Sequence, residues 1–178
     1  MRRESRVLFI VGCSKKKLSN CAPVRDFYQG QLFKMVKKLA TQNNFDYRAL
    51  SGKLGLLSPD EMVTPYDQKI ENSEESIKAI RDLTLPRLSK ILPKYDSIIL
   101  IMGKTYRKVI EPLVNRKFIV LFDKRGIFGY LSIISKYLKL PRAQVLKELE
   151  KFRIQEGTTN IEIHNELNKI TLEKWIGK

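Results

Sequence analysis

The sequence predicts an α/β protein with an open, mainly parallel sheet of about four strands flanked by helices, and a small C-terminal helical appendage. Three observations predict this class. Short apolar runs alternate with longer segments of helical periodicity, several runs end at a glycine or serine, and 43% apolar residues in a chain of 178 can build one core. This alternation is typical of a parallel sheet covered by helices.

The first third of the chain contains two predicted strands and one predicted helix. Residues 7–11 form a continuous apolar run, typical of a strand buried on both faces, and the run ends at Gly12. Residues 31–40 carry apolar side chains at helical spacing, and residues 45–50 form a second, weaker strand. A long loop is expected over residues 53–71.

A helix is predicted to begin at Asn72 or Ser73, either of which can cap it, with glutamates in its first turn. Pro86 is expected to kink or split this helix, because proline lacks the amide hydrogen that a helix interior uses. The elements that follow keep the alternation: a strand at residues 97–102, a helix at 104–114, a strand at 118–122 and a helix at 128–140.

The sequence changes character after residue 140. A helix is predicted over residues 142–153, with shorter helices at 160–167 and 171–176. The chain is therefore expected to divide into an α/β domain, residues 1–140, and a helical appendage, residues 141–178. The appendage holds 7 basic and 6 acidic residues, whereas a DNA-reading helix is basic. It is interpreted as a packing element or as a homodimer contact.

Positive charge is concentrated in two parts of the chain. The formal net charge is +15, from 34 Lys and Arg against 19 Asp and Glu. Residues 1–53 contribute 12 basic and 3 acidic side chains, residues 101–140 contribute 9 and 2, and the rest is close to neutral. This distribution indicates a phosphate-bearing partner, with a generally basic, solvated surface as the alternative.

Basic side chains follow each predicted strand at its carboxyl end. Parallel strands bring these ends to one edge of the sheet, where ligands bind, so we expect the loops to converge on a phosphate. Helix N-termini at that edge favour anions, and Tyr28 or Phe128 could stack on a base. The residues predicted to bind phosphate or nucleic acid are Ser14, Lys15, Lys16, Arg25, Lys53, Gly55, Tyr66, Lys104, Tyr106, Arg107, Lys124 and Arg125.

Asp26 and Asp67 are the predicted catalytic carboxylates. An aspartate surrounded by lysines stays ionised, and it can orient a water molecule or stabilise a cationic sugar transition state. The structural alternative is that Asp26 pairs with a basic side chain and that Asp67 forms an Asx-turn.

Composition and motifs argue against several kinds of site. Two cysteines and one histidine do not supply the roughly four ligands of a structural zinc site, so no metal is expected. Gly103-Lys104-Thr105 lacks the first glycine of a P-loop and no dinucleotide fingerprint is present, so no cofactor is expected. No apolar run approaches the roughly 20 residues that cross a bilayer, so we expect a cytoplasmic protein without a membrane partner.

Three motifs are more specific than the composition: CSKKK at residues 13–17, LSGKLGLL at 50–57 and PYD at 65–67. Over roughly residues 6–140 the chain resembles an uncharacterised domain family with CSKxK, LS[AG]KxGLL and PYD motifs. That family is distantly similar to the YaaA peroxide-stress proteins and to the uracil-DNA-glycosylase-like fold. The resemblance implies a nucleic acid or nucleotide as ligand. It also implies chemistry at an N-glycosidic bond.

The function we predict is binding of nucleic acid or a nucleotide through the basic loops. One alternative is an enzyme that hydrolyses or transfers at an N-glycosidic bond, with Asp26 or Asp67 as its carboxylate. The sequence lacks a recognisable glycosylase motif after the first strand and a histidine in the last loop, which argues against that alternative. The other alternative is an interaction protein that docks an acidic partner.

Overall fold

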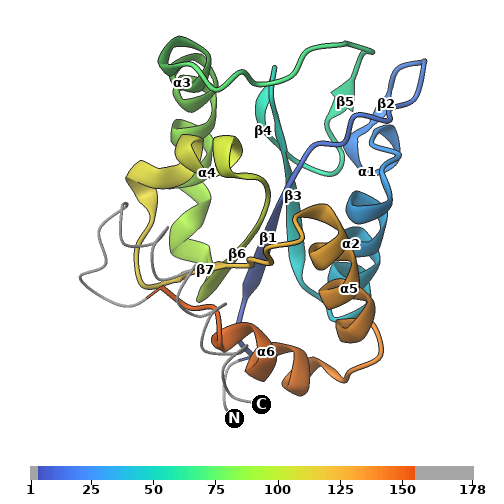
Figure 1. The fold of residues 1–178 in the computed structure, drawn as a ribbon, viewed down its shortest axis with the longest axis vertical. Coiled ribbons are helices and arrows are strands. Elements are labelled where there is room, and N and C mark those ends of the chain that lie inside the picture. The colour runs from blue at the N-terminus through green and yellow to red at the C-terminus, as the bar shows by residue number, and fades with distance from the viewer. Residues whose placement is uncertain (1–3, 155–178) are drawn as a thin grey trace.

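The computed structural model describes residues 4–154 and has the predicted class, a mainly parallel sheet flanked by helices (Figure 1). The sheet has five strands in the order β4-β3-β1-β6-β7. Four strands are parallel, and β4 is antiparallel to β3. Their bounds are β1 (Val7–Gly12), β3 (Asp46–Ser51), β4 (Gly55–Leu57), β6 (Ser97–Ile101) and β7 (Phe118–Val120).

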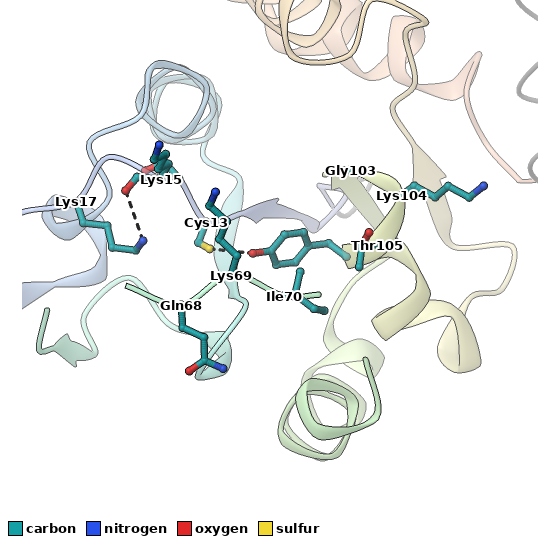
Figure 2. A pocket seen from close by; sticks show the side chains of 11 residues that line it. Cys13, Lys15, Lys17, Gln68, Lys69, Ile70, Gly103, Lys104 and Thr105 are labelled. Atoms are coloured by element: carbon teal, nitrogen blue, oxygen red, sulfur yellow. Dashed lines mark hydrogen bonds between the residues drawn. The ribbon is translucent and has the colours of Figure 1, made fainter. Parts of the chain in front are cut away.

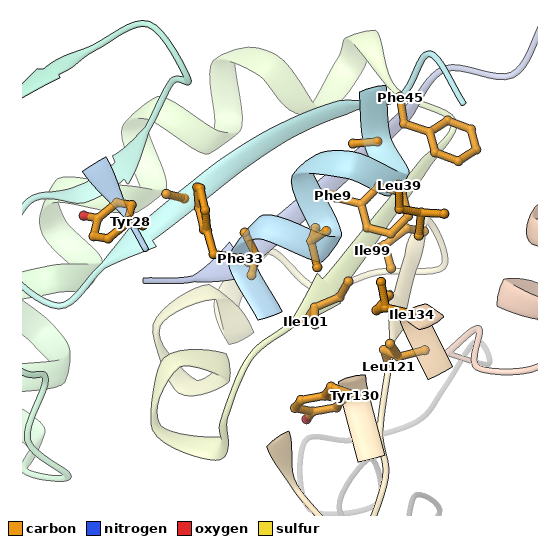
Figure 3. Close-up of a cluster of buried hydrophobic side chains, with 14 of the residues drawn as sticks. Phe9, Tyr28, Phe33, Leu39, Phe45, Ile99, Ile101, Leu121, Tyr130 and Ile134 are labelled. Atoms are coloured by element: carbon orange, nitrogen blue, oxygen red, sulfur yellow. The ribbon is translucent and has the colours of Figure 1, made fainter. Parts of the chain in front are cut away.

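The central strand β1 divides the core into two clusters. Successive side chains of a strand point to opposite faces, so Phe9 packs in one cluster while Leu8 and Ile10 pack in the other. Figure 3 shows the first cluster, in which Phe9, Leu39 and Ile134 meet. The helices on this side are α2 (Gln31–Gln42), α5 (Ile127–Tyr137) and α6 (Arg142–Glu150), and those on the other are α3 (Glu74–Ile91) and α4 (Lys104–Ile110).

The strand β4 lies within the segment expected to be a loop, and that expectation is wrong for Gly55–Leu57. A tight turn at residues 52–54 reverses the chain after β3, and Ser51 pairs with Gly55. Gly55 has φ +71, a conformation that side chains other than glycine rarely adopt. Leu56 and Leu57 are both buried, so the short strand is stabilised by packing and by its pairing with β3.

The helix α3 begins as predicted, because the Ser73 side chain accepts a hydrogen bond from the Ser76 amide. Pro86 does not split it: the helix continues through the proline to Ile91. Ile80 on one side of Pro86 and Leu88 on the other are buried in the second cluster. This packing offsets the hydrogen bond that the proline removes. The 3-10 turns η1 (Leu92–Lys94) and η2 (Glu111–Leu113) follow α3 and α4.

A small two-stranded sheet fixes the start of the connection between β5 and α3. β2 (Ala22–Pro23) pairs antiparallel with β5 (Met62–Val63), and α1 (Val24–Phe27) follows β2 directly. The Val24 amide donates to the Glu61 carbonyl at 2.9 Å. Residues 65–70 therefore begin directly after a strand, β5, that is paired with β2 in the region following β1.

The helix α6 packs on the body of the protein, with Val145 and Leu149 buried in the first cluster. Arg153 forms a β-bridge with Ile119. This part of the appendage is thus a packing element. The helices predicted at 160–167 and 171–176 lie outside the described residues, and the homodimer contact through residues 141–178 stays a prediction. Within residues 4–154, no helix combines the length and the apolar character that a membrane span requires.

Candidate functional site

A cavity of about 280 Å³ opens at the carboxyl end of the parallel strands. Three segments line it: residues 13–15 with Lys17 after β1, residues 68–70, and residues 103–106 after β6 (Figure 2). Two of these segments follow adjacent parallel strands, which is where an open α/β sheet binds ligands. The third segment comes from the long connection between β5 and α3.

Lysine is the charged residue of this cavity. Lys15, Lys17, Lys69 and Lys104 line it, and none of the described residues that line it is acidic. Figure 2 shows Lys15, Lys17 and Lys69 around Cys13, whereas the Lys104 side chain extends away from them. We call this cavity the lysine pocket. Uncompensated positive charge in a concave site favours an anionic ligand.

One wall of the lysine pocket is a contact between β1 and α4. The Cys13 Sγ lies 3.2 Å from the Tyr106 hydroxyl, and both residues line the cavity. The Ile70 amide favours the ionised form of the same hydroxyl, an effect smaller than that of burial. Burial raises the pKa of Tyr106 above its ordinary value, so the hydroxyl is neutral at physiological pH. Tyr106 thus joins all three segments of the pocket.

A cluster of hydroxyls beneath the pocket fixes the PYD motif. The Tyr66 hydroxyl lies 2.7 Å from the Ser51 Oγ and 2.7 Å from the Tyr28 hydroxyl. The Ser51 Oγ accepts from the Lys53 and Leu54 amides, so its own proton is available to Tyr66. Burial raises the pKa of Tyr66 to about 12. These bonds connect the PYD motif to the end of β3 and place residues 68–70 over the pocket.

Gly52 allows segment 68–70 to lie close to the end of β3. A Cβ atom at this position would be 2.6 Å from the Ile70 amide nitrogen and 2.8 Å from the Tyr106 hydroxyl oxygen. Both distances are shorter than real carbon contacts. The pocket in its present shape therefore requires a residue without a side chain at position 52.

Ser14 shapes the turn after β1. Its Oγ donates to the Lys16 carbonyl at 2.7 Å and accepts from the Gly30 amide at 3.0 Å. The hydroxyl proton that would bind a phosphate is already used in the turn. Ser14 lines the pocket, and its hydrogen bonds fix the backbone of the turn that carries the lysines of the CSKKK motif.

Four of the predicted phosphate-binding residues line the lysine pocket: Ser14, Lys15, Lys104 and Tyr106. Tyr66 lies against it, since the Nζ atoms of Lys17 and Lys53 are 4.7 and 5.6 Å from the centre of its ring. Lys17 and Lys69 were missed as site residues. Lys17 could have been predicted because it belongs to the CSKKK motif that follows the first strand. Lys69 follows no predicted strand, so nothing in the sequence indicated it.

Several predicted residues do not line the pocket. Arg25 pairs with Asp60 and with Asp26. Lys16 is exposed and is not among the described residues that line the cavity. Gly55 is the first residue of β4, directly after the turn. Tyr28, a stacking candidate, is 1% exposed, so no base can reach its ring.

The two predicted catalytic carboxylates have different surroundings. Asp26 accepts from the Lys37 Nζ at 3.2 Å, which fits the structural alternative of pairing with a basic side chain. Asp67 is exposed and directly precedes Gln68 of the pocket lining. Asp67 has no hydrogen bond or ion pair to another described residue. The catalytic roles of both aspartates stay predictions.

The remaining basic residues form a second group near the end of β7. The Arg125 side chain donates to Asp123 at 2.8 and 2.9 Å and holds the pKa of that carboxyl below its usual value. Arg107 lies over the ring of Phe122, 5.7 Å from its centre. Lys124, exposed, stands beside Arg125 in the same turn.

No cluster of metal-ligating side chains is found in residues 4–154. Cys13 and Cys21 are free thiols. Neither observation identifies a cofactor, and the lysine pocket remains the site with the clearest chemical character.

The fold and the pocket define a class of protein: an α/β domain with a lysine-lined cavity where its parallel strands end. The chain belongs to a family of unknown function, DUF6884, whose model matches residues 8–124. The match includes every residue that lines the lysine pocket. No match was found among the curated proteins.

Proposed function

We propose that this protein binds nucleic acid or a nucleotide, with a phosphate group held in the lysine pocket. The observation that carries the proposal is the lining of the cavity, which contains four lysines and no acidic residue among those described. A phosphate attracts several lysines at once because each forms a charge-assisted hydrogen bond with it. The sequence-predicted convergence of Lys15 and Lys104 supports the same ligand class.

The size of the cavity supports a small unit of such a ligand. A volume of about 280 Å³ lies at the lower end of the range for small-molecule sites. It can take a phosphate with part of one nucleotide, while the rest of a polymer lies outside. The neutral Tyr106 hydroxyl and the Thr105 side chain are hydrogen-bonding groups for a sugar or a base.

The CSKKK, LSGKLGLL and PYD motifs supply three parts of this site: the lysines after β1, the turn with Gly52, and Tyr66. They resemble an uncharacterised family that is distantly similar to the YaaA and uracil-DNA-glycosylase-like proteins, and this distant similarity supports a nucleic acid or nucleotide ligand. The lack of an acidic residue among the described pocket lining favours binding over N-glycosidic chemistry. The competing hypothesis is that the basic face binds an acidic protein. Competition by a free nucleotide distinguishes the two hypotheses, because only a nucleic acid or nucleotide ligand should be displaced from the lysine pocket by it.

Binding of labelled oligonucleotides measured over a range of salt concentrations tests this proposal. If the protein neutralises about six phosphates, log K should fall with log salt at a slope near −5 on duplex DNA and near −4 on a single strand. Free nucleotide is expected to compete, because it fills the lysine pocket. Absence of binding at low salt, or binding that is indifferent to salt, would contradict the proposal.

A further inference from the structure

We propose that the lysine pocket selects a phosphomonoester over a phosphodiester. Its ligand is then the terminal phosphate of a nucleic acid chain or the phosphate of a free mononucleotide, and not a phosphate inside a continuous backbone. This inference rests on the proposed function of the pocket and deepens it, because it names the phosphate chemistry that the pocket recognises.

The charge of the pocket matches a dianion better than a monoanion. Lys15, Lys17 and Lys69 surround Cys13, and no described residue of the lining is acidic (Figure 2). The Lys17 Nζ donates to the Lys15 carbonyl only at 3.5 Å, so this ammonium group is weakly engaged by the protein. A phosphomonoester carries a charge of about −1.5 to −2 at neutral pH, whereas a phosphodiester carries a single charge. The additional charge is stabilised where several cations have no acidic partner.

The directions from which the lysines reach the pocket also suit a terminal phosphate. Lys15 and Lys17 come from the turn after β1, and Lys69 comes from the connection between β5 and α3. A phosphomonoester offers three free oxygen atoms as strong acceptors. Each can accept a charge-assisted hydrogen bond from one lysine. A phosphodiester has only two such oxygens, because the other two continue the chain, so one lysine would be left without an oxygen.

The inner wall of the pocket favours a chain end as well. The contact between the Cys13 Sγ and the Tyr106 hydroxyl, 3.2 Å long, joins the end of β1 to α4. Burial raises the pKa of Tyr106, so this wall is neutral at physiological pH and does not repel an anion. The cavity of about 280 Å³ takes one phosphate with part of a nucleotide. An internal phosphate would have to bring two chain segments through that volume, whereas a terminal phosphate brings one.

Two sets of probes test the selectivity on the whole protein. The first set is thymidine 5′-monophosphate and its methyl ester, which share base and sugar but differ in phosphate charge and free oxygens. The second set is an oligothymidylate of about 12 nucleotides with a 5′-phosphate, with a 3′-phosphate or with hydroxyls at both ends.

We expect the monophosphate to bind about 10-fold more tightly than its methyl ester. At least one phosphorylated oligonucleotide should gain a similar factor over the strand with hydroxyl ends, and the arm that gains identifies the end that is bound. One added phosphate changes the total charge of such a strand only slightly, so the overall field of the protein cannot produce this gain.

Two single variants locate the selectivity in the pocket. Lys69→Gln removes one of the three lysines around Cys13 and is expected to reduce the monoester preference below about 3-fold. Lys16→Gln is the matched control, because Lys16 belongs to the same CSKKK motif but is exposed and is not among the described residues of the lining. It should keep the 10-fold preference.

The outcomes separate this inference from the proposed function. Equal affinity for the monophosphate and its methyl ester, with no gain from either terminal phosphate, would overturn the monoester selectivity while salt-dependent oligonucleotide binding keeps the proposed function. Equal loss of preference in Lys16→Gln and Lys69→Gln would show that the pocket is not its source. If the parent binds neither the mononucleotide nor any oligonucleotide, both proposals fail.

Discussion

Replacing Lys15, Lys17 and Lys69 together with glutamine is expected to weaken oligonucleotide binding about 100-fold at low salt. The reason is that these lysines surround Cys13 in the lysine pocket without an acidic residue among the described lining. Three lost phosphate contacts at about 1 kcal/mol each give about 3 kcal/mol, which corresponds to roughly two decades in affinity. Because these lysines hold one phosphate, the salt slope on a single strand should become shallower by about 0.7.

The matched control removes the same charge elsewhere. Lys38, Lys139 and Lys147 are exposed side chains on or next to α2, α5 and α6, outside the pocket lining. Replacing these three with glutamine is expected to change the oligonucleotide affinity less than about 5-fold, because it alters only the overall electrostatic field of the protein. Equal losses in the two triple variants would show that net charge, and not the pocket, determines binding.

The second large effect is expected from Gly52→Ala. The added Cβ would be 2.6 Å from the Ile70 nitrogen, a backbone atom that cannot turn away, and 2.8 Å from the Tyr106 hydroxyl. Segment 68–70 must then move, at an overpacking cost of about 1–3 kcal/mol of unfolding free energy. Displacement of Lys69 from the pocket should weaken oligonucleotide binding about 10-fold in addition.

Gly103→Ala is the matched control, because Gly103 also lines the pocket but a Cβ atom there would meet no described atom within 4 Å. Its cost should stay below about 1 kcal/mol, the value of a changed helix cap. Denaturant unfolding and oligonucleotide binding of both variants measure the difference. If Gly52→Ala behaves like Gly103→Ala, segment 68–70 does not lie where the structure places it.

Much of the fold could be predicted because apolar runs in a parallel sheet are buried on both faces. Residues 7–11 and 98–102 are continuous apolar runs, and they contribute to the inner strands β1 and β6. β4 was missed because three residues are too short for a pattern and because its pairing depends on the turn at Gly52. Pro86 was expected to interrupt a helix, but the buried side chains around it decide the outcome.

The candidate site could be predicted only where a strand leads into it. Lys15 and Lys104 follow adjacent parallel strands, so topology alone brings them to one edge. Lys69 arrives through a long connection whose path depends on the Tyr66 hydroxyl bonding to Ser51. A contact between two side chains that are 15 residues apart leaves no periodic signal in the sequence. For the same reason the pairing of Arg25 with Asp60 could not be foreseen.

The central claim is that a phosphate binds among Lys15, Lys17 and Lys69. The most direct measurement is an NMR titration of lysine-labelled protein with thymidine 5′-monophosphate, in which each side-chain Nζ signal is followed separately. We predict saturable shifts at these three lysines, abolished by high salt, with the signals of Lys38, Lys139 and Lys147 unmoved. Shifts of equal size at both sets of lysines, or none at any concentration of the nucleotide, would contradict it.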